Sequence, residues 1–436
     1  MGVPHWLLDG LSRPLSSQLS LTLGRQYLSG AGNFVSYSPT PANVMVGSAA
    51  PAIPADAYNA AASYLFPQQR NYELNLSPNL VSSTGAGFGI LRLDNSEDNV
   101  GVSPGFGNIT IKAGTNLALT SGGWLSLSAG NITVENGASV TASGGWLGFN
   151  AYDISSSQAE LIASELLQAS ATVTATPYDP RRGKVSIGAG AVLSTAGGVV
   201  DERMASGTAG TRPLVTGGGG IGIKGNDILL KSGSALTVSG GAVISSSGKT
   251  TYSDAGSITL NAGKALAVQN GFGAVLGGRL SLTGASLEGY AGLGRKSGAL
   301  DLQAPSIQID ALPGGQTAAT DAASGALKLG PGFFNAGGFA SFTVTGLGVA
   351  TGVEGSVTGP LTAFSIAANT TVQSVVQNWD TLPGGSIYLA PAGVRQAASL
   401  NFKTAGLFAD VNSLLLGNSI DLVLGAGRVT VVCPPL

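Results

Sequence analysis

The residue types that most often perform catalysis are scarce in this chain. Its 436 residues include one histidine and one cysteine. His5 is the only side chain available to a Ser-His-Asp triad or a histidine-based metal site, and it lies close to the first residue. Cys433 has no histidine near it in the sequence and no second cysteine with which to form a disulfide. We therefore predict no catalytic residue, no metal site and no cofactor.

Carboxylates are the next candidates, because paired carboxylates supply the acid and the base in polysaccharide cleavage. The densest group is Asp94, Glu97 and Asp98. A Ca²⁺ or sugar site is its functional interpretation, and a solvated turn is the favoured structural one. The three residues are kept as candidate ligand contacts. The sparser acidic pairs are Asp201 with Glu202 and Asp301 with Asp310.

Two tryptophans have matching surroundings. Gly-Gly-Trp occurs at residues 122–124 and again at residues 144–146, 22 residues later. If this interval is one structural repeat, Trp124 and Trp146 stack on each other. Aromatic faces suit pyranose rings, so the pair is a candidate sugar platform, although a structural aromatic ladder is preferred. Trp124 and Trp146 complete the set of candidate ligand contacts.

The elements that must hold these residues are short and repetitive. Apolar-polar-apolar triplets begin at Ile109, Leu125, Val185, Ile221, Ile258, Leu280 and Leu300. Such a triplet is a short strand with one face inward, because alternate side chains point to opposite sides. Triplets at Ile221, Ile228 and Leu236 follow each other at separations of 7 and 8 residues, which indicates three strands in about 20 residues.

This repetition predicts successive coils whose strands pair in parallel and whose inward side chains form ladders. Ile258, Leu280 and Leu300, separated by 22 and 20 residues, are interpreted as copies of one strand. The 37 residues from Ile221 to Ile258 are interpreted as about two coils. Glycine and asparagine are expected at the bends, where the amide side chain hydrogen-bonds neighbouring coils. The candidate bend residues are Asn108, Asn131, Asn226 and Asn270.

The predicted fold class is therefore all-β, a right-handed parallel β-helix with a few helical or loop insertions. Residues 1–100 form an irregular region that caps or decorates the first coils, and 55–66 are a candidate helix. Residues 101–310 form the regular β-helix, with a helical insertion at 153–182 and an exposed loop at 199–220. Residues 311–436 are predicted as a looser, truncated continuation. β-Hairpin meanders are the main rival, but their Asn-Gly and Asp-Gly turns are scarce.

Composition and charge exclude several classes of protein and partner. Hydrophobic residues make up 43% of the chain and charged residues 10%, so a disordered chain is excluded. The net charge of −2 and scattered lysines and arginines argue against a nucleic-acid partner. We predict no membrane span, because no apolar run is long enough. The first residues do not resemble a signal peptide, so if the protein is secreted we expect either an interior piece of a larger protein or a true start that lies upstream.

Residues 107–114 and 255–263 resemble the shaft repeats of filamentous-haemagglutinin-type exoproteins, which are adhesins secreted by two-partner systems of Gram-negative bacteria. Residues 337–344 are similar to a recurring segment of long members, and the resemblance covers roughly residues 80–400. Ser77-Pro78-Asn79-Leu80 resembles the family's Asn-Pro-Asn-Leu secretion motif. Serine replaces the first asparagine, so no secretion domain is assigned.

The resemblance implies a right-handed β-helix at the bacterial cell surface. It also implies an outer-membrane two-partner transporter as export partner and a host or neighbouring-cell glycan or protein as ligand. The first hypothesis is a structural or adhesive shaft without enzyme activity. The second is a polysaccharide lyase or glycoside hydrolase, which requires two carboxylates within about 10 Å on one face. A trimeric fibre or tailspike is the third, and no trimer-forming end is evident in the sequence.

Overall fold

The described part of the chain is built from strands. The computed structural model describes residues 17–22, 25–28, 34–37, 44–46, 74–76, 88–95, 108–151, 183–201, 203, 217–263, 278–321, 325–347, 349–351, 357–360, 362–381, 387–404, 414–416, 421–424 and 428–432. Within these ranges the helices are three short 3-10 segments, η2 (Pro313–Gly315), η3 (Pro331–Asn335) and η4 (Ala392–Val394). The prediction of an all-β chain is confirmed for these residues.

Most strands belong to three sheets, named here the long, second and third sheets. In sheet order the long sheet contains β1 (Ser17–Thr22), β6 (Phe88–Asn95), β9 (Trp124–Ala129), β12 (Trp146–Ala151), β16 (Gly220–Gly225), β21 (Ser257–Ala262), β25 (Ala299–Ala304), β29 (Ser341–Gly346), β36 (Ser399–Thr404) and β39 (Arg428–Val432). The second contains β5 (Leu74–Leu76), β4 (Val44–Val46), β7 (Asn108–Ile111), β10 (Asn131–Val134), β13 (Lys184–Ile187), β17 (Asp227–Leu230) and β22 (Leu280–Ser281). The third contains β8 (Asn116–Ala118), β11 (Ser139–Thr141), β14 (Val192–Ser194), β18 (Ala235–Thr237) and β23 (Ser286–Glu288).

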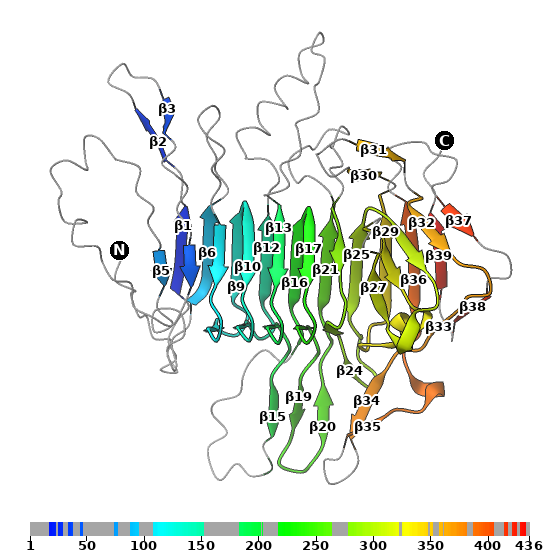
Figure 1. Cartoon of the computed structure of the whole chain (residues 1–436). Helices are drawn as coiled ribbons and strands as arrows, with labels where there is room; N and C mark the ends of the chain where they lie inside the picture. The colour runs from blue at the N-terminus through cyan, green and yellow to red at the C-terminus, as the bar shows by residue number, and fades with distance from the viewer. Residues whose placement is uncertain are drawn as a thin grey trace.

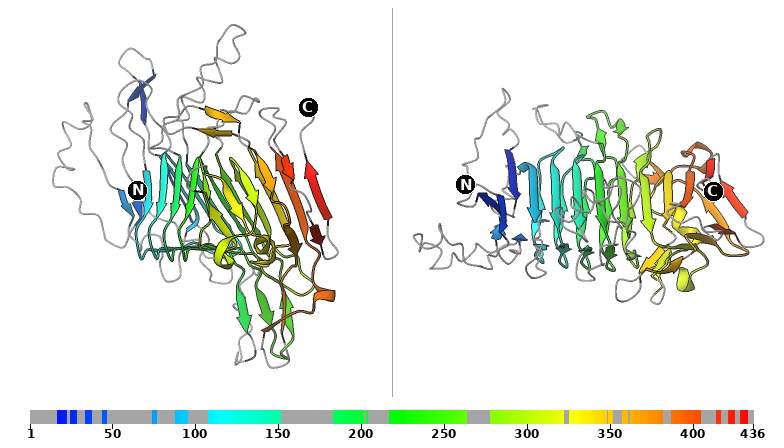
Figure 2. Two further views of the ribbon diagram at one scale, coloured as in Figure 1. Left: turned by 45° about the vertical axis from the view of Figure 1, so that its right-hand side comes forward. Right: turned by 90° about the horizontal axis from the view of Figure 1, so that it is seen from above.

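The chain visits these sheets in a fixed order, and one pass through all three is called a rung below. Strands β10, β11 and β12 form one rung, and each pairs in parallel with its counterpart in the previous rung. Trp146 therefore lies opposite Trp124, and Asn131 lies opposite Asn108. Figure 1 shows the rungs side by side from the blue to the red end of the chain, and Figure 2 shows the same row from two further directions.

Side chains that face the interior form continuous columns. On the long sheet the first inward column holds Leu125, Leu147, Ile221, Ile258 and Leu300, and the second holds Leu127, Phe149, Ile223, Leu260 and Leu302. All ten are at most 2% exposed. The third column is alanine or glycine, and at Gly225 a Cβ would lie only 2.9 Å from the carbonyl oxygen of Gly183. Close backbone approach therefore favours a small residue at position 225.

The bend between the second and third sheets repeats one backbone conformation. It is occupied in five successive rungs by Gly114, Gly137, Gly190, Gly233 and Gly284, whose φ angles are 71°, 68°, 67°, 79° and 72°. Residues with a Cβ are disfavoured in this left-handed region, whereas glycine enters it freely. The expectation that glycine marks the bends is confirmed here.

The three-strand repeat predicted from Ile221, Ile228 and Leu236 is confirmed, because these residues lie in β16, β17 and β18 of three different sheets. The assignment of Leu280 was wrong. Leu280 lies in the second sheet opposite Ile228, whereas Ile258 pairs with Leu300. Triplets of all three sheets have the same apolar pattern, so spacing alone assigned a second-sheet strand to the long sheet.

The 37 residues from Ile221 to Ile258 make one rung rather than two, because these residues are register partners. A hairpin of β19 (Ala242–Ile244) and β20 (Thr250–Tyr252) lengthens this rung. The predicted loop at 199–220 likewise begins as a strand, β15 (Val199–Asp201), which pairs with β19. Together with β24 (Ala291–Gly292), β34 (Asn378–Thr381) and β35 (Ile387–Leu389), these strands project below the three sheets in Figure 1.

The rung order changes after β25. The long sheet continues, but the third sheet ends at β23 and η3 lies near its edge. The chain enters a mixed sheet of β27 (Ala318–Thr320), β28 (Leu327–Leu329), β26 (Ile307–Ile309), β32 (Phe364–Ile366) and β37 (Leu414–Leu416). The remaining strands form three pairs: β2 (Arg25–Leu28) with β3 (Phe34–Tyr37), β30 (Val349–Thr351) with β31 (Val357–Pro360), and β33 (Thr371–Ser374) with β38 (Asp421–Leu424).

Both predicted helices, at 55–66 and at 153–182, lie outside the described residues. Among the residues that are described, no helix is long and apolar enough to cross a membrane.

Replacing Ile223 by alanine should destabilise the rungs around it. Ile223 is fully buried between Phe149 and Leu260, so truncation removes apolar contacts from two neighbours. We expect a loss of about 2–5 kcal/mol in the free energy of unfolding, measured by guanidinium denaturation. The control Lys224→Ala changes the next, outward residue and should stay within about 0.5 kcal/mol of the parent. Equal effects of the two variants would contradict the inward assignment of Ile223.

Candidate functional site

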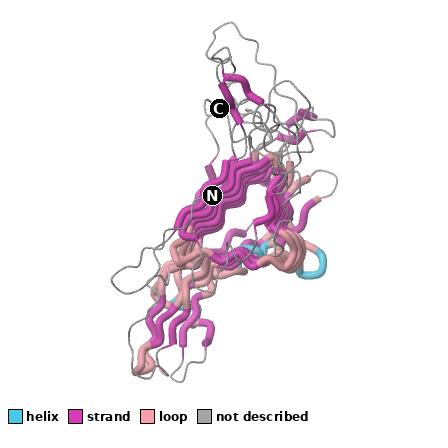
Figure 3. The backbone as a smooth tube through the Cα atoms, turned by 90° about the vertical axis from the view of Figure 1, so that its left-hand side faces the viewer, coloured by secondary structure: helices cyan, strands magenta, loops and turns pink. Residues whose placement is uncertain are grey.

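The outward face of the long sheet carries the tryptophan candidates. Figure 3 looks along the stack and shows this sheet forming one side of it. Its first outward row is Ile90, Trp124, Trp146, Gly220, Ser257, Ala299, Ser341 and Ser399. Its second row is Arg92, Ser126, Gly148, Gly222, Thr259, Asp301, Thr343 and Asn401, and its third is Asp94, Ser128, Asn150, Lys224, Asn261, Gln303, Thr345 and Lys403. Most of the polar side chains in these rows are uncharged.

Trp124 and Trp146 lie one rung apart, as predicted. Their ring centroids are 6.1 Å apart, and the ring planes are tilted by 42°. Trp124 is 48% exposed, and its neighbour Ile90 in the preceding rung is 36% exposed. The two indoles thus form a partly solvent-exposed apolar patch on a sheet face that otherwise carries mostly polar side chains.

Glycines under Trp146 have no Cβ and so leave room for its ring to lie close to the sheet. A Cβ at Gly220 would overlap the six-membered ring of Trp146. At Gly222 it would lie 2.8 Å from Trp146 Cζ2, and at Gly148 it would lie 3.0 Å from Nε1. Trp146 therefore lies across the backbone of its own and the next strand. These glycines were not among the predicted site residues, although Gly220-Ile221-Gly222-Ile223, with glycine at alternate strand positions, was the available signal.

Asp94, the acidic candidate that the structure describes, does not lie beside the indoles. Asp94 faces outward near the end of β6, four residues beyond Ile90, the register partner of Trp124. Four residues of strand span roughly 13 Å, so Asp94 lies at the far end of the strand. Glu97 and Asp98 lie outside the described residues, as do His5 and Cys433.

In the sequence Asp301 lies between two apolar residues, which predicts an outward side chain, and one repeat step places it near Ser281. It does face outward between two buried leucines, but it lies opposite Thr259 and Thr343, whereas Ser281 belongs to the second sheet. Burial raises the pKa of the Asp301 carboxyl, and the positive charge of Lys403 partly opposes that shift. Asp301 is thus a half-buried acid on a polar face.

The other acids are dispersed. Asp201 lies on the projection, where hydrogen bonds and charge from Arg203 lower its pKa to about 2. Asp310 is exposed at the end of β26, and Glu202 lies outside the described residues. Within the described ranges, no three His, Cys, Asp or Glu side chains gather in a group able to hold a metal ion.

Polar residues also form a column at the start of the second sheet. Asn131 Nδ2 donates to Asn108 Oδ1 at 3.0 Å, and the amide of Lys184 donates to Asn131 Oδ1 at 3.1 Å. Asp227 follows, accepting from the amide of Arg279 at 3.0 Å. Burial raises the pKa of Asp227, while the charges of Arg279 and Lys184 oppose the rise. The column links rungs as the asparagine prediction requires.

Asn226 lies one residue before this column. It is 1% exposed, and neither side-chain polar atom has a hydrogen-bond partner. It therefore occupies a bend, as predicted, without the expected inter-rung bond. Asn270 lies outside the described residues.

The long-sheet face can bind but has few groups for chemistry. Hydroxyls and amides offer neutral hydrogen bonds, and the two indoles offer an apolar platform. Asp301 is five strands from Asp94, which is roughly 24 Å at the usual strand spacing. That separation is too large for a pair of glycosidase carboxylates, which lie about 5–9.5 Å apart.

Comparison of the chain with models of protein families, with curated protein sequences and with solved structures gives no match.

Gly220→Ala should lift the Trp146 indole from the sheet, because the added methyl overlaps the ring. We expect the fluorescence of Trp146 to shift to longer wavelength, in a chain whose Trp6, Trp124 and Trp379 are replaced by phenylalanine. Gly332→Ala is the control, since a Cβ there meets nothing within 4 Å. An unchanged spectrum in Gly220→Ala would refute the close packing of Trp146 on glycine.

Asp301→Asn should change the dependence of stability on pH. Because the folded pKa of Asp301 is raised, the folded protein holds the proton more tightly than the unfolded chain. The contribution of Asp301 to stability is thus complete below about pH 4 and is lost as the pH rises through the folded pKa. Unfolding free energies from pH 3 to 7 should decline less in Asp301→Asn. The control Asn261→Ser should keep the parent slope, and an identical slope in both variants would exclude a raised pKa.

Proposed function

We propose that the chain is a shaft segment of a filamentous-haemagglutinin-type exoprotein and binds glycans on the outward face of its long sheet. The description of the fold as a right-handed parallel β-helix is part of this proposal. Strands that leave one parallel sheet and return to it cross over with a right hand in nearly all known cases. The repeated order of three parallel sheets is therefore best described as a right-handed parallel β-helix. On this proposal the protein is secreted through a two-partner outer-membrane transporter and stays at the bacterial cell surface.

The observation that carries the binding function is the exposed Trp124 beside the glycine-supported Trp146. Tyrosine and tryptophan are favoured at recognition surfaces because they provide large contact areas with few rotatable bonds. Trp146 is further restrained by Gly220 and Gly222, so little side-chain entropy remains to be lost on binding. Ser126 lies two residues from Trp124 on the same outward face and offers a hydroxyl beside the indoles, and Ser128 lies farther along the same strand. A neutral, hydroxyl-rich ligand such as a glycan chain matches this chemistry.

An enzyme is the second candidate, favoured by one observation. Asp301 has a raised pKa, as a general acid requires, and it lies on the face of a parallel sheet. The other carboxylate described on the outward face of the long sheet, Asp94, is about 24 Å away, which is beyond catalytic spacing. The binding function is therefore preferred, and an enzyme would require a partner acid from elsewhere in the chain.

The test is a glycan and polysaccharide array probed with the purified chain, with and without Ca²⁺, followed by titration of the best ligand. Trp124→Ala and Trp146→Ala should each weaken binding about tenfold or more, equivalent to about 1.4 kcal/mol. Ser341→Ala, in the same outward row but four strands beyond Trp146, should bind like the parent. Circular dichroism and melting temperature check that both tryptophan variants remain folded.

The outcomes separate the candidates. Binding without product release supports adhesion. Release of oligosaccharide that Asp301→Asn abolishes would replace the adhesive proposal with the enzymatic one. If the chain binds no glycan, the proposed glycan binding is wrong and only the role of a structural shaft remains.

A further inference from the structure

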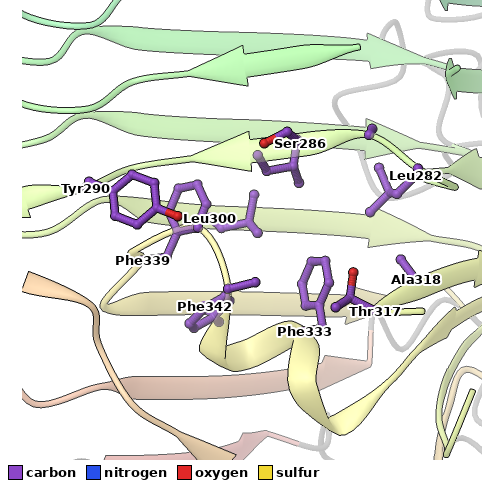
Figure 4. A pocket seen from close by; sticks show the side chains of 14 residues that line it. Leu282, Ser286, Tyr290, Leu300, Thr317, Ala318, Phe333, Phe339 and Phe342 are labelled. Atoms are coloured by element: carbon purple, nitrogen blue, oxygen red, sulfur yellow. The ribbon is translucent and has the colours of Figure 1, made fainter. Parts of the chain in front are cut away.

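A cavity opens where the third sheet ends. Among the described strands, β23 has a neighbour on one side only, β18, and η3 lies across the cavity from it. The cavity has a volume of about 350 Å³ and lies between residues 282–290 on one side and residues 317–318 and 333–339 on the other. Leu300 and Phe342 of the long sheet also line it. Figure 4 shows side chains from all these segments converging.

The third sheet itself explains the opening. Ala285 occupies the position just before β23, equivalent to Thr115, Ala138, Ala191 and Ser234 in earlier rungs. All four equivalents are at most 2% exposed, because the next rung covers them. Ala285 is only partly buried, since no further third-sheet strand follows. The cavity therefore lies where a further strand of the third sheet would pair with β23. The end of a core column is exposed in it.

Aromatic rings dominate the walls. Phe333 and Phe339 pack edge-to-face on Phe342, with centroid distances of 6.3 and 6.0 Å. Edge-to-face packing is the favoured arrangement of aromatic pairs. Leu282 and Leu300 complete an apolar lining, and the three phenylalanines and two leucines are each at most 8% exposed.

Polar atoms also line the cavity, and three of its side chains carry a hydroxyl. Tyr290 is held by an edge contact to Trp379 at 5.8 Å, and its hydroxyl lies against the backbone amide of Gly337. Ser286 Oγ donates to Glu288 Oε1 at 2.9 Å. Thr317 is exposed on the opposite wall. Two of the three hydroxyls are thus already engaged within the protein, so the side chains left to contact a ligand are mainly the apolar ones.

We propose that this cavity binds a small planar aromatic molecule of one or two fused rings. Its volume lies at the lower end of the range of ligand pockets, about 300–1,000 Å³. Its mostly buried phenylalanine walls supply edge and face contacts to an entering ring. The site belongs to the junction of β23 and η3 and shares no residue with the tryptophan face of the long sheet. It is therefore independent of the proposed glycan binding.

Indole is the probe for this site. Equilibrium dialysis of the whole chain should show saturable binding of one indole, and octanoate should bind at least tenfold more weakly. Ala285→Leu fills the cavity from its rim and should weaken indole binding at least tenfold. Ala299→Leu makes the same change on the outward face of the long sheet and should bind indole like the parent. Intermolecular nuclear Overhauser effects should connect indole protons with the rings of Phe333 and Phe342.

Three binding results would overturn the proposal. These are non-saturable indole binding, equal or tighter binding of octanoate, and unchanged affinity in a folded Ala285→Leu variant. If Ala285→Leu does not fold, the Overhauser contacts decide, because they are measured on the unmodified chain. Contacts only to tryptophan protons would place indole elsewhere and overturn the site.

Discussion

The whole structure depends on parallel pairing between equivalent strands of successive rungs. A single rung presents an apolar strip that it cannot bury alone, and it acquires a core only when the next rung covers it. The pairing also fixes which residues meet on the outside, so Trp146 lies beside Trp124 and above Gly220. A shift of one residue in this register would turn Leu147 and Phe149 outward, which the burial of both side chains opposes.

This dependence explains how much could be predicted. Class and repeat follow from local patterns, because an apolar-polar-apolar triplet and a bend glycine contain their own structural information. Sheet membership does not, because Leu280 and Leu300 begin similar triplets yet lie in different sheets. The hairpin β19–β20 adds length within a rung, and nothing in the spacing distinguishes such a rung from two short ones.

The candidate sites divide in the same way. Adjacency of the two tryptophans was predictable, since it follows directly from the repeat. The glycine support for Trp146 required the register partner, which lies 74 positions away. The cavity at β23 could not be predicted from any motif, because it arises from a strand that the third sheet lacks. A site formed by equivalent residues of successive repeats can thus be predicted from the sequence. A site formed where the repeat is interrupted can be found only in the three-dimensional structure.

The direction of the hydrogen bonds has a mechanical consequence. Bonds between rungs run along the stack, so tension applied to the two ends of such a shaft loads them nearly end-on. They would break one rung at a time rather than all together. Each released rung of about 22 residues would provide roughly 70 Å of extended chain in place of about 4.8 Å of stack. A surface protein built in this way would lengthen stepwise under flow and so limit the force that reaches any ligand attached to its side.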